Sequence, residues 1–242
     1  MNYIIDIGNT RVKIYLFEKE KILSRETVSE SKLLSKVQDD SKSIKIDFVI
    51  FSSVTKDYKK ELTKIFKNSK VISLSDKNLQ FPFKNNYKSI SSLGDDRKAL
   101  SSAAVFKYPN LNNLVIDLGS CITYDFIDSS NNYFGGAISP GLSFRYRSLS
   151  EFTFNLPSLE FKYIEKNIGT NTEESIHIGI SNGIISEVNR FINNLKTDYP
   201  DLNVIITGGD SMFLLNKIKN AIFADQDFLA IGLNNIIKLN ND

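Results

Sequence analysis

One short stretch near the start of the chain joins an apolar run to residues that can bind a phosphate group. Asp6, Gly8, Asn9 and Thr10 follow the apolar residues 3–5. Glycine lets the backbone approach a ligand, and a turn of this kind can aim backbone N–H groups at phosphate oxygens. Asp6 would repel a bare phosphate, so it points to a divalent metal or a water between it and a nucleotide. The other interpretation is a hairpin in which these residues only form the turn.

The same arrangement recurs about half a chain later. A second apolar run ends on Asp117, and Gly119 and Ser120 then lead into another run. Asp117 and Gly119 have the same spacing as Asp6 and Gly8. Two copies of one strand–turn–strand unit predict a duplicated fold with a cleft between its halves. From this repeat we infer a phosphate clamp with one turn from each half.

Composition excludes several classes of protein. The chain has 242 residues, with 30 basic and 28 acidic side chains and a formal net charge of +2. This balance indicates neither a nucleic-acid partner nor an acidic membrane partner. Cys121 is the single cysteine, so no intrachain disulfide can form. No apolar run approaches the roughly 20 residues that span a bilayer, and the N-terminus is unlike a basic signal peptide, so we expect a soluble cytoplasmic protein.

Hydrophobic periodicity predicts an α/β architecture. Residues 2–28 are expected to form a three-stranded meander, and residues 31–74 to alternate helix, strand, helix and strand. A meander followed by such alternation is typical of a mixed sheet covered by helices. Residues 75–93 are expected to form a long surface loop.

The second half of the chain contains glycine pairs next to two apolar runs. Residues 131–141 are expected to form a strand that leads into a glycine-rich bend. Gly208 and Gly209 follow a buried strand and suit an adenine or ribose that lies flat on the backbone. The expected helices cover residues 142–152, 172–198 with Thr172 as N-cap, 211–218 and 227–239.

The sequence Gly94-Asp95-Asp96-Arg97 opens an alanine-rich segment in the manner of a helix N-terminus. Asp95 and Asp96 can simply cap this helix and favour its dipole. Arg97 opposes the dipole in the first turn, so an anionic partner explains it better than capping does. Both capping and ligand binding stay open at this position.

Two reactive residue types lack the neighbours that their chemistry needs. His177 is the only histidine, so we do not expect a zinc site. We expect His177 to be a packed or surface residue of a helix. No cation lies near Cys121 in the sequence to activate its thiol, so we expect a small buried strand residue. The chain also has no nucleophile elbow, no Walker A spacing and no three-glycine dinucleotide motif.

Six motifs resemble, in the same order, those of the type III pantothenate kinase family. They are Asp-Ile-Gly-Asn-Thr at 6–10, Gly-Asp-Asp-Arg at 94–97, Asp-Leu-Gly-Ser at 117–120, Gly-Gly-Ala-Ile-Ser-Pro-Gly at 135–141, Asn-Thr at 171–172 and Thr-Gly-Gly-Asp at 207–210. This family belongs to the actin, hexokinase and Hsp70-like ATPase superfamily. The resemblance implies an α/β fold of duplicated ribonuclease H-like domains, with mixed sheets, flanking helices and a cleft between the domains. The implied actin-like ATPase subdomains are residues 1–110 and 111–242.

Position by position, the resemblance implies a role for each site residue. Asp96 corresponds to the family's proton acceptor. Substrate contacts are implied at Tyr87, Gly94, Asp95, Asp96, Arg97 and Thr172. Contacts with ATP are implied at Asp6, Ile7, Gly8, Asn9, Thr10, Arg11, Val12, Lys13 and Ser120. Asp117 corresponds to a ligand of a monovalent cation, K⁺ or NH₄⁺, and Asp6 is expected to bind Mg²⁺ through water.

The implied activity is ATP-dependent phosphorylation of pantothenate to 4′-phosphopantothenate, the first step of coenzyme A biosynthesis, by a cytoplasmic homodimer. The chemistry agrees, because Asp96 can accept the proton of an alcohol and Arg97 offers a planar fork for a carboxylate. One alternative is a kinase or phosphatase of the same superfamily that acts on a sugar or polyphosphate. Such an enzyme would not need Tyr87 to bind its substrate. Another is a catalytically silent regulator, which would not need the loop carboxylates.

Two stretches depart from the family pattern. Gly119-Ser120-Cys121 stands where relatives usually have Gly-Thr-Ala, and we expect the hydroxyl of Ser120 to preserve the phosphate contact. After Thr172 the chain reads Ser-Ile-His-Ile-Gly where relatives tend to have Ser-Met-Gln-Ser-Gly. This second change is expected to alter details of the helix and of its subunit contact, and not the reaction.

Overall fold

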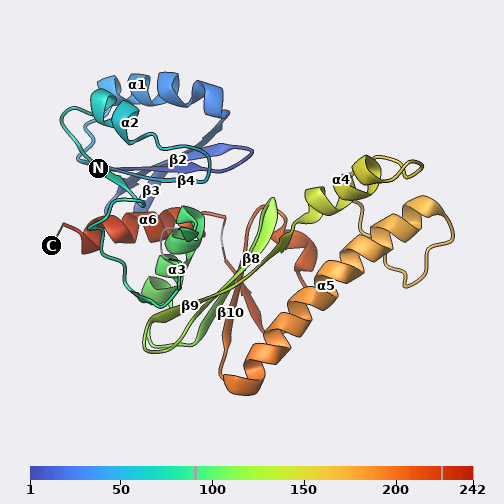
Figure 1. Cartoon of the computed structure of the whole chain (residues 1–242). Helices are drawn as coiled ribbons and strands as arrows, with labels where there is room; N and C mark the ends of the chain where they lie inside the picture. The colour runs from blue at the N-terminus through green and yellow to red at the C-terminus, as the bar shows by residue number, and fades with distance from the viewer. Residues whose placement is uncertain (90–91, 225, 242) are drawn as a thin grey trace. The chain divides into compact units, whose positions relative to one another are not determined.

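The structure is a computed structural model that describes residues 1–89, 92–224 and 226–241. The chain forms two compact units, whose elements are shown in Figure 1. The first unit consists of Met1–Asn110, Ser130–Phe134 and Asp227–Asp242, and the second of Leu111–Ser129 and Gly135–Gln226. Within the described ranges, no helix is both long enough and apolar enough to cross a lipid bilayer.

The first unit is built on a five-stranded mixed sheet. Its strands are β1 Asn2–Ile7, β2 Val12–Glu18, β3 Lys21–Val28, β4 Phe48–Ser53 and β5 Lys70–Ser73. They lie in the order β3-β2-β1-β4-β5. β1, β2 and β3 pair antiparallel, which confirms the predicted meander, and β4 and β5 continue parallel to β1.

Helices cover both faces of this sheet (Figure 1). They are α1 Leu33–Ser43 and α2 Lys59–Ile65 on one face, and α3 Asp95–Lys107 and α6 Phe228–Leu239 on the other. Because side chains alternate along a strand, Ile5 packs in the first layer and Ile4 in the second. A Cβ on Gly232 of α6 would lie 2.1 Å from the carbonyl oxygen of Ala99 in α3. Glycine therefore allows these two helices to touch through their backbones.

The second unit repeats this architecture. Its strands are β7 Asn113–Leu118, β8 Cys121–Ile127, β9 Asn132–Pro140, β10 Asn203–Thr207 and β11 Ala221–Phe223. Their order, β9-β8-β7-β10-β11, matches that of the first sheet, with β7 and β8 antiparallel and β10 and β11 parallel to β7. The duplicated ribonuclease H-like α/β fold is therefore confirmed. The first residues of β9 belong to the first unit, where they pair with β6, Lys84–Asn85.

Two helices complete the second unit, and both confirm the predicted ranges. They are α4 Leu142–Phe152 and α5 Thr172–Asp198. The apolar stripe of α5 packs against residues of the sheet that include Leu114, Ile116 and Tyr124. The buried residues of the stripe are Ile176, Ile180, Ile184, Val188 and Ile192.

The predicted glycine-rich bend before α4 is wrong, because β9 continues through both glycines to Pro140. A Cβ on Gly136 would lie 1.8 Å from the carbonyl oxygen of Tyr124 in β8. Close backbone packing between two strands therefore explains the absence of a side chain at Gly136.

Two helix ends also differ from the prediction. The N-cap of α5 is Asn171 and not Thr172, since the Asn171 side chain accepts the N–H group three residues further on at 2.9 Å. The helix predicted after residue 210 is only a 3₁₀ turn, η3 Ser211–Leu214. The turn ends at Leu215, whose ψ of 130° is extended, and Asn216 follows in a left-handed conformation with a φ of 67°.

Candidate functional site

Asp6 ends β1 and is held by residues of two neighbouring strands in the first unit. It lies in register with Lys13 on β2 and with Ser52 on β4. The hydroxyl of Ser52 donates a hydrogen bond of 2.9 Å to Asp6 Oδ1. Burial raises the pKa of Asp6 above its ordinary value, and the charge of Lys13 and the bond from Ser52 oppose that rise.

The turn after Asp6 exposes three polar side chains to solvent. The N–H group of Gly8 donates to the carbonyl oxygen of Arg11 at 3.1 Å and closes the turn. Ile7 and Val12 are buried in the core, so they can meet a ligand only through their main-chain atoms. The exposed side chains are Asn9, Thr10 and Arg11. This is the arrangement that a phosphate-binding turn requires.

The start of α3 carries a second, partly buried carboxylate of the first unit. Gly94 is the N-cap, and Asp96 Oδ1 accepts a hydrogen bond of 2.8 Å from the N–H group of Arg97. A Cβ on Gly94 would lie 2.5 Å from the same oxygen, so a larger residue at position 94 would displace the Asp96 carboxylate. Burial raises the pKa of Asp96, and the N–H bond and positive charge of Arg97 oppose this.

Asp96 acts electrostatically on Asp6, and its neighbour Arg97 packs on an aromatic ring. The negative charge of Asp96 adds to the rise in the pKa of Asp6, so the two carboxylates influence each other. Arg97 is buried, and its Cζ lies 5.7 Å from the centroid of the Tyr87 ring. The first unit therefore brings together four of the residues predicted from the sequence. We call Asp6, Asp96, Arg97 and Tyr87 the carboxylate cluster.

Asp95 has a structural contact that the sequence did not reveal. Its carboxylate is buried and forms an ion pair of 2.9 Å with Lys98, one turn further along α3. The hydroxyl of Ser75 lies 3.3 Å from the other carboxylate oxygen. These contacts hold the start of α3 against the segment that follows β5.

The turn between β7 and β8 repeats the first turn in the second unit. Asp117 ends β7 and lies in register with Thr123 on β8 and Thr207 on β10. The N–H group of Gly119 donates to the carbonyl oxygen of Cys121 at 3.0 Å. The partners of Asp117 in register are thus two hydroxyl side chains, where Asp6 has a lysine and a serine.

Two glycines from distant motifs pack directly on this second turn. Gly208 has a φ of 100°, and a Cβ there would lie 2.4 Å from Asp117 Oδ1. Gly141 donates its N–H group to the carbonyl oxygen of Ser120 at 3.0 Å, and a Cβ there would lie 2.2 Å from the carbonyl oxygen of Gly119. Both glycines therefore allow close backbone contact with the turn.

Thr123 is a candidate ligand that the sequence analysis missed. Its side chain is buried, and its Oγ1 has no hydrogen-bond partner among the residues that the structure describes. A buried hydroxyl without a partner is costly, and together with the Asp117 carboxylate opposite it supplies the oxygen ligands that an alkali cation takes. The sequence position of Thr123 could have predicted this, because the hairpin pairs it directly with Asp117.

Thr172 is the first residue of α5, and it is exposed in the second unit. It lines an open cavity of about 800 Å³ together with Asn171, Ser175 and Arg145. A ligand in this cavity would meet a helix N-terminus, neutral hydroxyl groups and the Arg145 side chain.

The two isolated reactive residues behave as packed side chains. His177 is buried, and its Nδ1 lies 2.7 Å from the hydroxyl of Tyr146 on α4. This confirms a packed helix residue. Cys121 is the first residue of β8 and is half-buried, so it lies less deep than predicted.

Comparison with known proteins identifies the family. The family model described as type III pantothenate kinase matches residues 3–194. The type III pantothenate kinase of Christiangramia forsetii is 42% identical over 99% of each chain. That of Flavobacterium psychrophilum is 38% identical over 96% of each chain. A ROK family glucokinase from Streptomyces griseus, 12% identical, is similar in fold with a TM-score of 0.55 over 98% of each chain. The chain therefore belongs to the type III pantothenate kinase family.

Proposed function

We propose that this chain transfers the terminal phosphoryl group of ATP to the primary hydroxyl group of pantothenate. The product is 4′-phosphopantothenate, and the reaction begins coenzyme A biosynthesis. Membership of the family supports the reaction. The observation that carries it to individual residues is the carboxylate cluster of the first unit, in which Asp96 and Asp6 interact and Arg97 lies beside Tyr87.

Asp96 is the proposed general base. A primary alcohol is a poor nucleophile, and a carboxylate within hydrogen-bond reach can accept its proton during phosphoryl transfer. Because burial raises the pKa of Asp96, its carboxylate is a stronger proton acceptor than an exposed aspartate. Arg97 limits the rise and so keeps the ionised form accessible.

Arg97 and Tyr87 are the proposed contacts for pantothenate. The guanidinium group of Arg97 offers two parallel donors to the substrate carboxylate, and its position over the Tyr87 ring restricts its motion. Gly94 and Asp95 form the adjoining helix start and are proposed to line the same subsite. Thr172 is a proposed substrate contact in the second unit, through the cavity that it lines.

The two turns are the proposed binding elements for the phosphates of ATP. In the first turn, the side chains of residues 9–11 are exposed, and Lys13 lies in register with Asp6. In the second turn, Ser120 supplies a hydroxyl group. Among the described residues, no three His, Cys, Asp or Glu side chains form a metal site. Mg²⁺ is often held by one or two carboxylates with water and substrate phosphates, so Asp6 fits that role.

Asp117 and Thr123 are the proposed ligands of a monovalent cation, K⁺ or NH₄⁺. The carboxylate supplies charge, and the Thr123 hydroxyl supplies a buried oxygen that has no hydrogen-bond partner among the described residues. When bound, Mg²⁺ and the monovalent cation would offset the negative charge on the phosphates during transfer.

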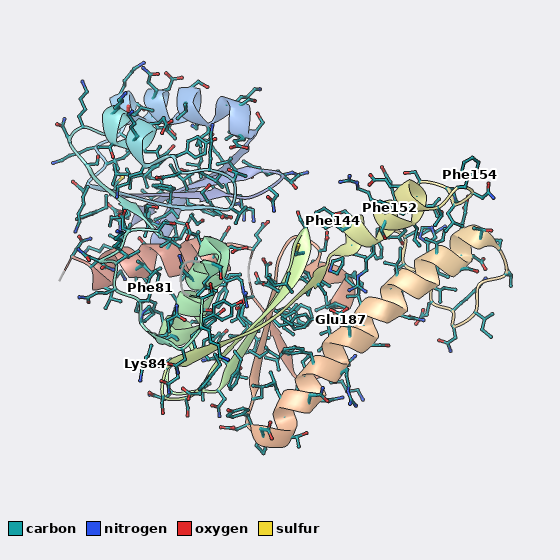
Figure 2. All side chains as sticks on the ribbon, viewed as in Figure 1. Phe81, Lys84, Phe144, Phe152, Phe154 and Glu187 are labelled. Atoms are coloured by element: carbon teal, nitrogen blue, oxygen red, sulfur yellow. The ribbon has the colours of Figure 1, made fainter. Side chains whose placement is uncertain are left out.

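An exposed apolar surface on the second unit supports a homodimer. Phe152 is 84% exposed and Phe154 is fully exposed, and Figure 2 shows both at the C-terminal end of α4, with Phe144 nearer its start. Exposed apolar groups of this size mark interaction surfaces. We propose that a second copy of the chain covers it.

The cytoplasm is the proposed compartment of this reaction, because ATP, the phosphoryl donor, is made and used there. The free thiol of Cys121 fits a reducing environment. Neither a nucleic acid nor a membrane takes part in the proposed chemistry.

Replacement of the base tests the central assignment. Asp96→Asn preserves shape but cannot accept a proton, so we expect kcat/KM for pantothenate to fall by about 10²–10⁴-fold. Binding of ATP, measured by calorimetry, should persist. Asp39→Asn, on the exposed surface of α1, is the matched control and should keep full activity. Normal turnover by Asp96→Asn would remove this residue from the mechanism.

Thr123→Val tests the cation site without loss of packing volume. The substitution removes a buried hydroxyl that has no partner among the described residues, so stability to urea should be unchanged or higher. The K⁺ concentration that gives half-maximal activity should rise on the order of tenfold, since one ligand is lost. Ser101→Ala removes another such hydroxyl, in α3, and should leave the K⁺ response unchanged. A wild-type K⁺ response in Thr123→Val would exclude Thr123 as a ligand.

Light scattering tests the dimer. The wild-type protein should have the mass of two chains, and the double variant Phe152→Ser/Phe154→Ser should have the mass of one. Phe106→Ser, on the first unit, is the control and should remain dimeric. A wild-type protein of single-chain mass would contradict the proposal.

A further inference from the structure

The carboxylate of Glu187, in the middle of α5, joins four elements of the second unit; its position is labelled in Figure 2. The hydroxyl of Tyr124 on β8 donates a hydrogen bond of 2.8 Å to Glu187 Oε1, and the hydroxyl of Ser139 on β9 donates to the same oxygen. Arg145 of α4 forms an ion pair of 2.6 Å with Glu187 Oε2. The proposed reaction assigns no step to Glu187, Tyr124 or Ser139, and Arg145 enters it only as a lining residue of the Thr172 cavity.

Arg145 connects this network to the end of β9. Its Nε donates a hydrogen bond of 2.7 Å to the carbonyl oxygen of Pro140, while its Nη2 binds Glu187. One guanidinium group therefore fixes the backbone next to Gly141 and the carboxylate of α5 at the same time. A lysine has a single point of attachment and cannot make both contacts in this geometry.

Gly141 connects the end of β9 to the second turn. Its N–H group donates a hydrogen bond of 3.0 Å to the carbonyl oxygen of Ser120, and a Cβ there would lie 2.2 Å from the carbonyl oxygen of Gly119. In a planar trans peptide the N–H group of the next residue points opposite to the carbonyl. Two carbonyls held toward Gly141 therefore direct the N–H groups of Ser120 and Cys121 away from it.

The charges of Glu187 and Arg145 favour a fixed arrangement of their side chains. Burial tends to raise the pKa of Glu187, but hydrogen bonds from Ser139, Arg145 and Tyr124 outweigh this effect and lower it, so the carboxylate stays ionised at neutral pH. Charge-assisted hydrogen bonds are stronger and more directional than neutral ones. The Glu187 and Arg145 side chains are only 32% and 20% exposed, so solvent competes little for them.

We propose that Glu187 and Arg145 are positioning residues for nucleotide binding. They hold Ser139, Pro140 and Gly141 in place, and through Gly141 they set the direction in which the second turn presents its N–H groups to a phosphate. The inference rests on the proposed function, in which this turn binds ATP.

Two conservative variants test the inference. Glu187→Gln loses the charge but keeps the size of the side chain, and Arg145→Lys keeps the charge but loses the fork. The measurements are the ATP dissociation constant without pantothenate, the KM for each substrate, and the midpoint of thermal unfolding. We expect both variants to raise the dissociation constant and the KM for ATP about tenfold. In Glu187→Gln the KM for pantothenate should stay within about twofold of wild type, because Glu187 does not line the cavity of Thr172.

A second arginine–glutamate pair of α4 supplies the matched control. Arg147 and Glu151 are 2.8 Å apart, and their side chains are 63% and 49% exposed. Arg147→Lys and Glu151→Gln should leave every one of these constants unchanged, because exposed ion pairs contribute little.

The outcomes separate positioning from simple stabilisation. A lower unfolding midpoint with unchanged ATP affinity in Glu187→Gln and Arg145→Lys would overturn the proposal, since a purely structural network behaves in that way. If the wild-type protein binds ATP but does not phosphorylate pantothenate, the proposed function fails, and the ATP affinities of the variants still decide the role of Glu187. A wild-type protein that binds no ATP would overturn both.

Discussion

Two carboxylates that influence each other inside the first unit are the constraint on which the site depends. Asp6 and Asp96 both have a raised pKa because they are buried. Buried charges are unstable unless nearby groups compensate them. The sheet supplies Ser52 and Lys13 in register with Asp6, and the first turn of α3 supplies Arg97 beside Asp96. The sheet and the start of α3 therefore supply the groups that compensate the charges of Asp6 and Asp96.

The second unit uses the same strand order for different chemistry. Asp117 occupies the position of Asp6, but its partners in register are Thr123 and Thr207. Hydroxyl groups carry no charge, so the second turn lacks the positive side chain that Lys13 places in register with Asp6 in the first. The two units thus share one strand order, and the residues on neighbouring strands determine what each turn can bind.

Local patterns predicted the meander, the long helix α5 and both turns, because each depends on neighbours in the sequence. The contacts of the first turn could not be predicted so directly, since Ser52 binds Asp6 from β4, which is distant in the sequence. Tertiary packing also decides that α6 covers the first sheet, through the contact of Gly232 with Ala99. The helix predicted after residue 210 is only a short turn because the backbone is extended at Leu215 and left-handed at Asn216, which periodicity does not reveal.

The pH dependence of kcat/KM for pantothenate tests the buried base most directly. An exposed aspartate has a pKa of about 3.9, and burial raises the pKa of Asp96 above that value. As the pH falls through the raised pKa, the base becomes protonated and the rate must fall. We predict an acid limb with its midpoint clearly above pH 4, at values where circular dichroism still shows folded protein. A rate that stays constant down to about pH 4 would contradict the assignment of Asp96 as a buried base.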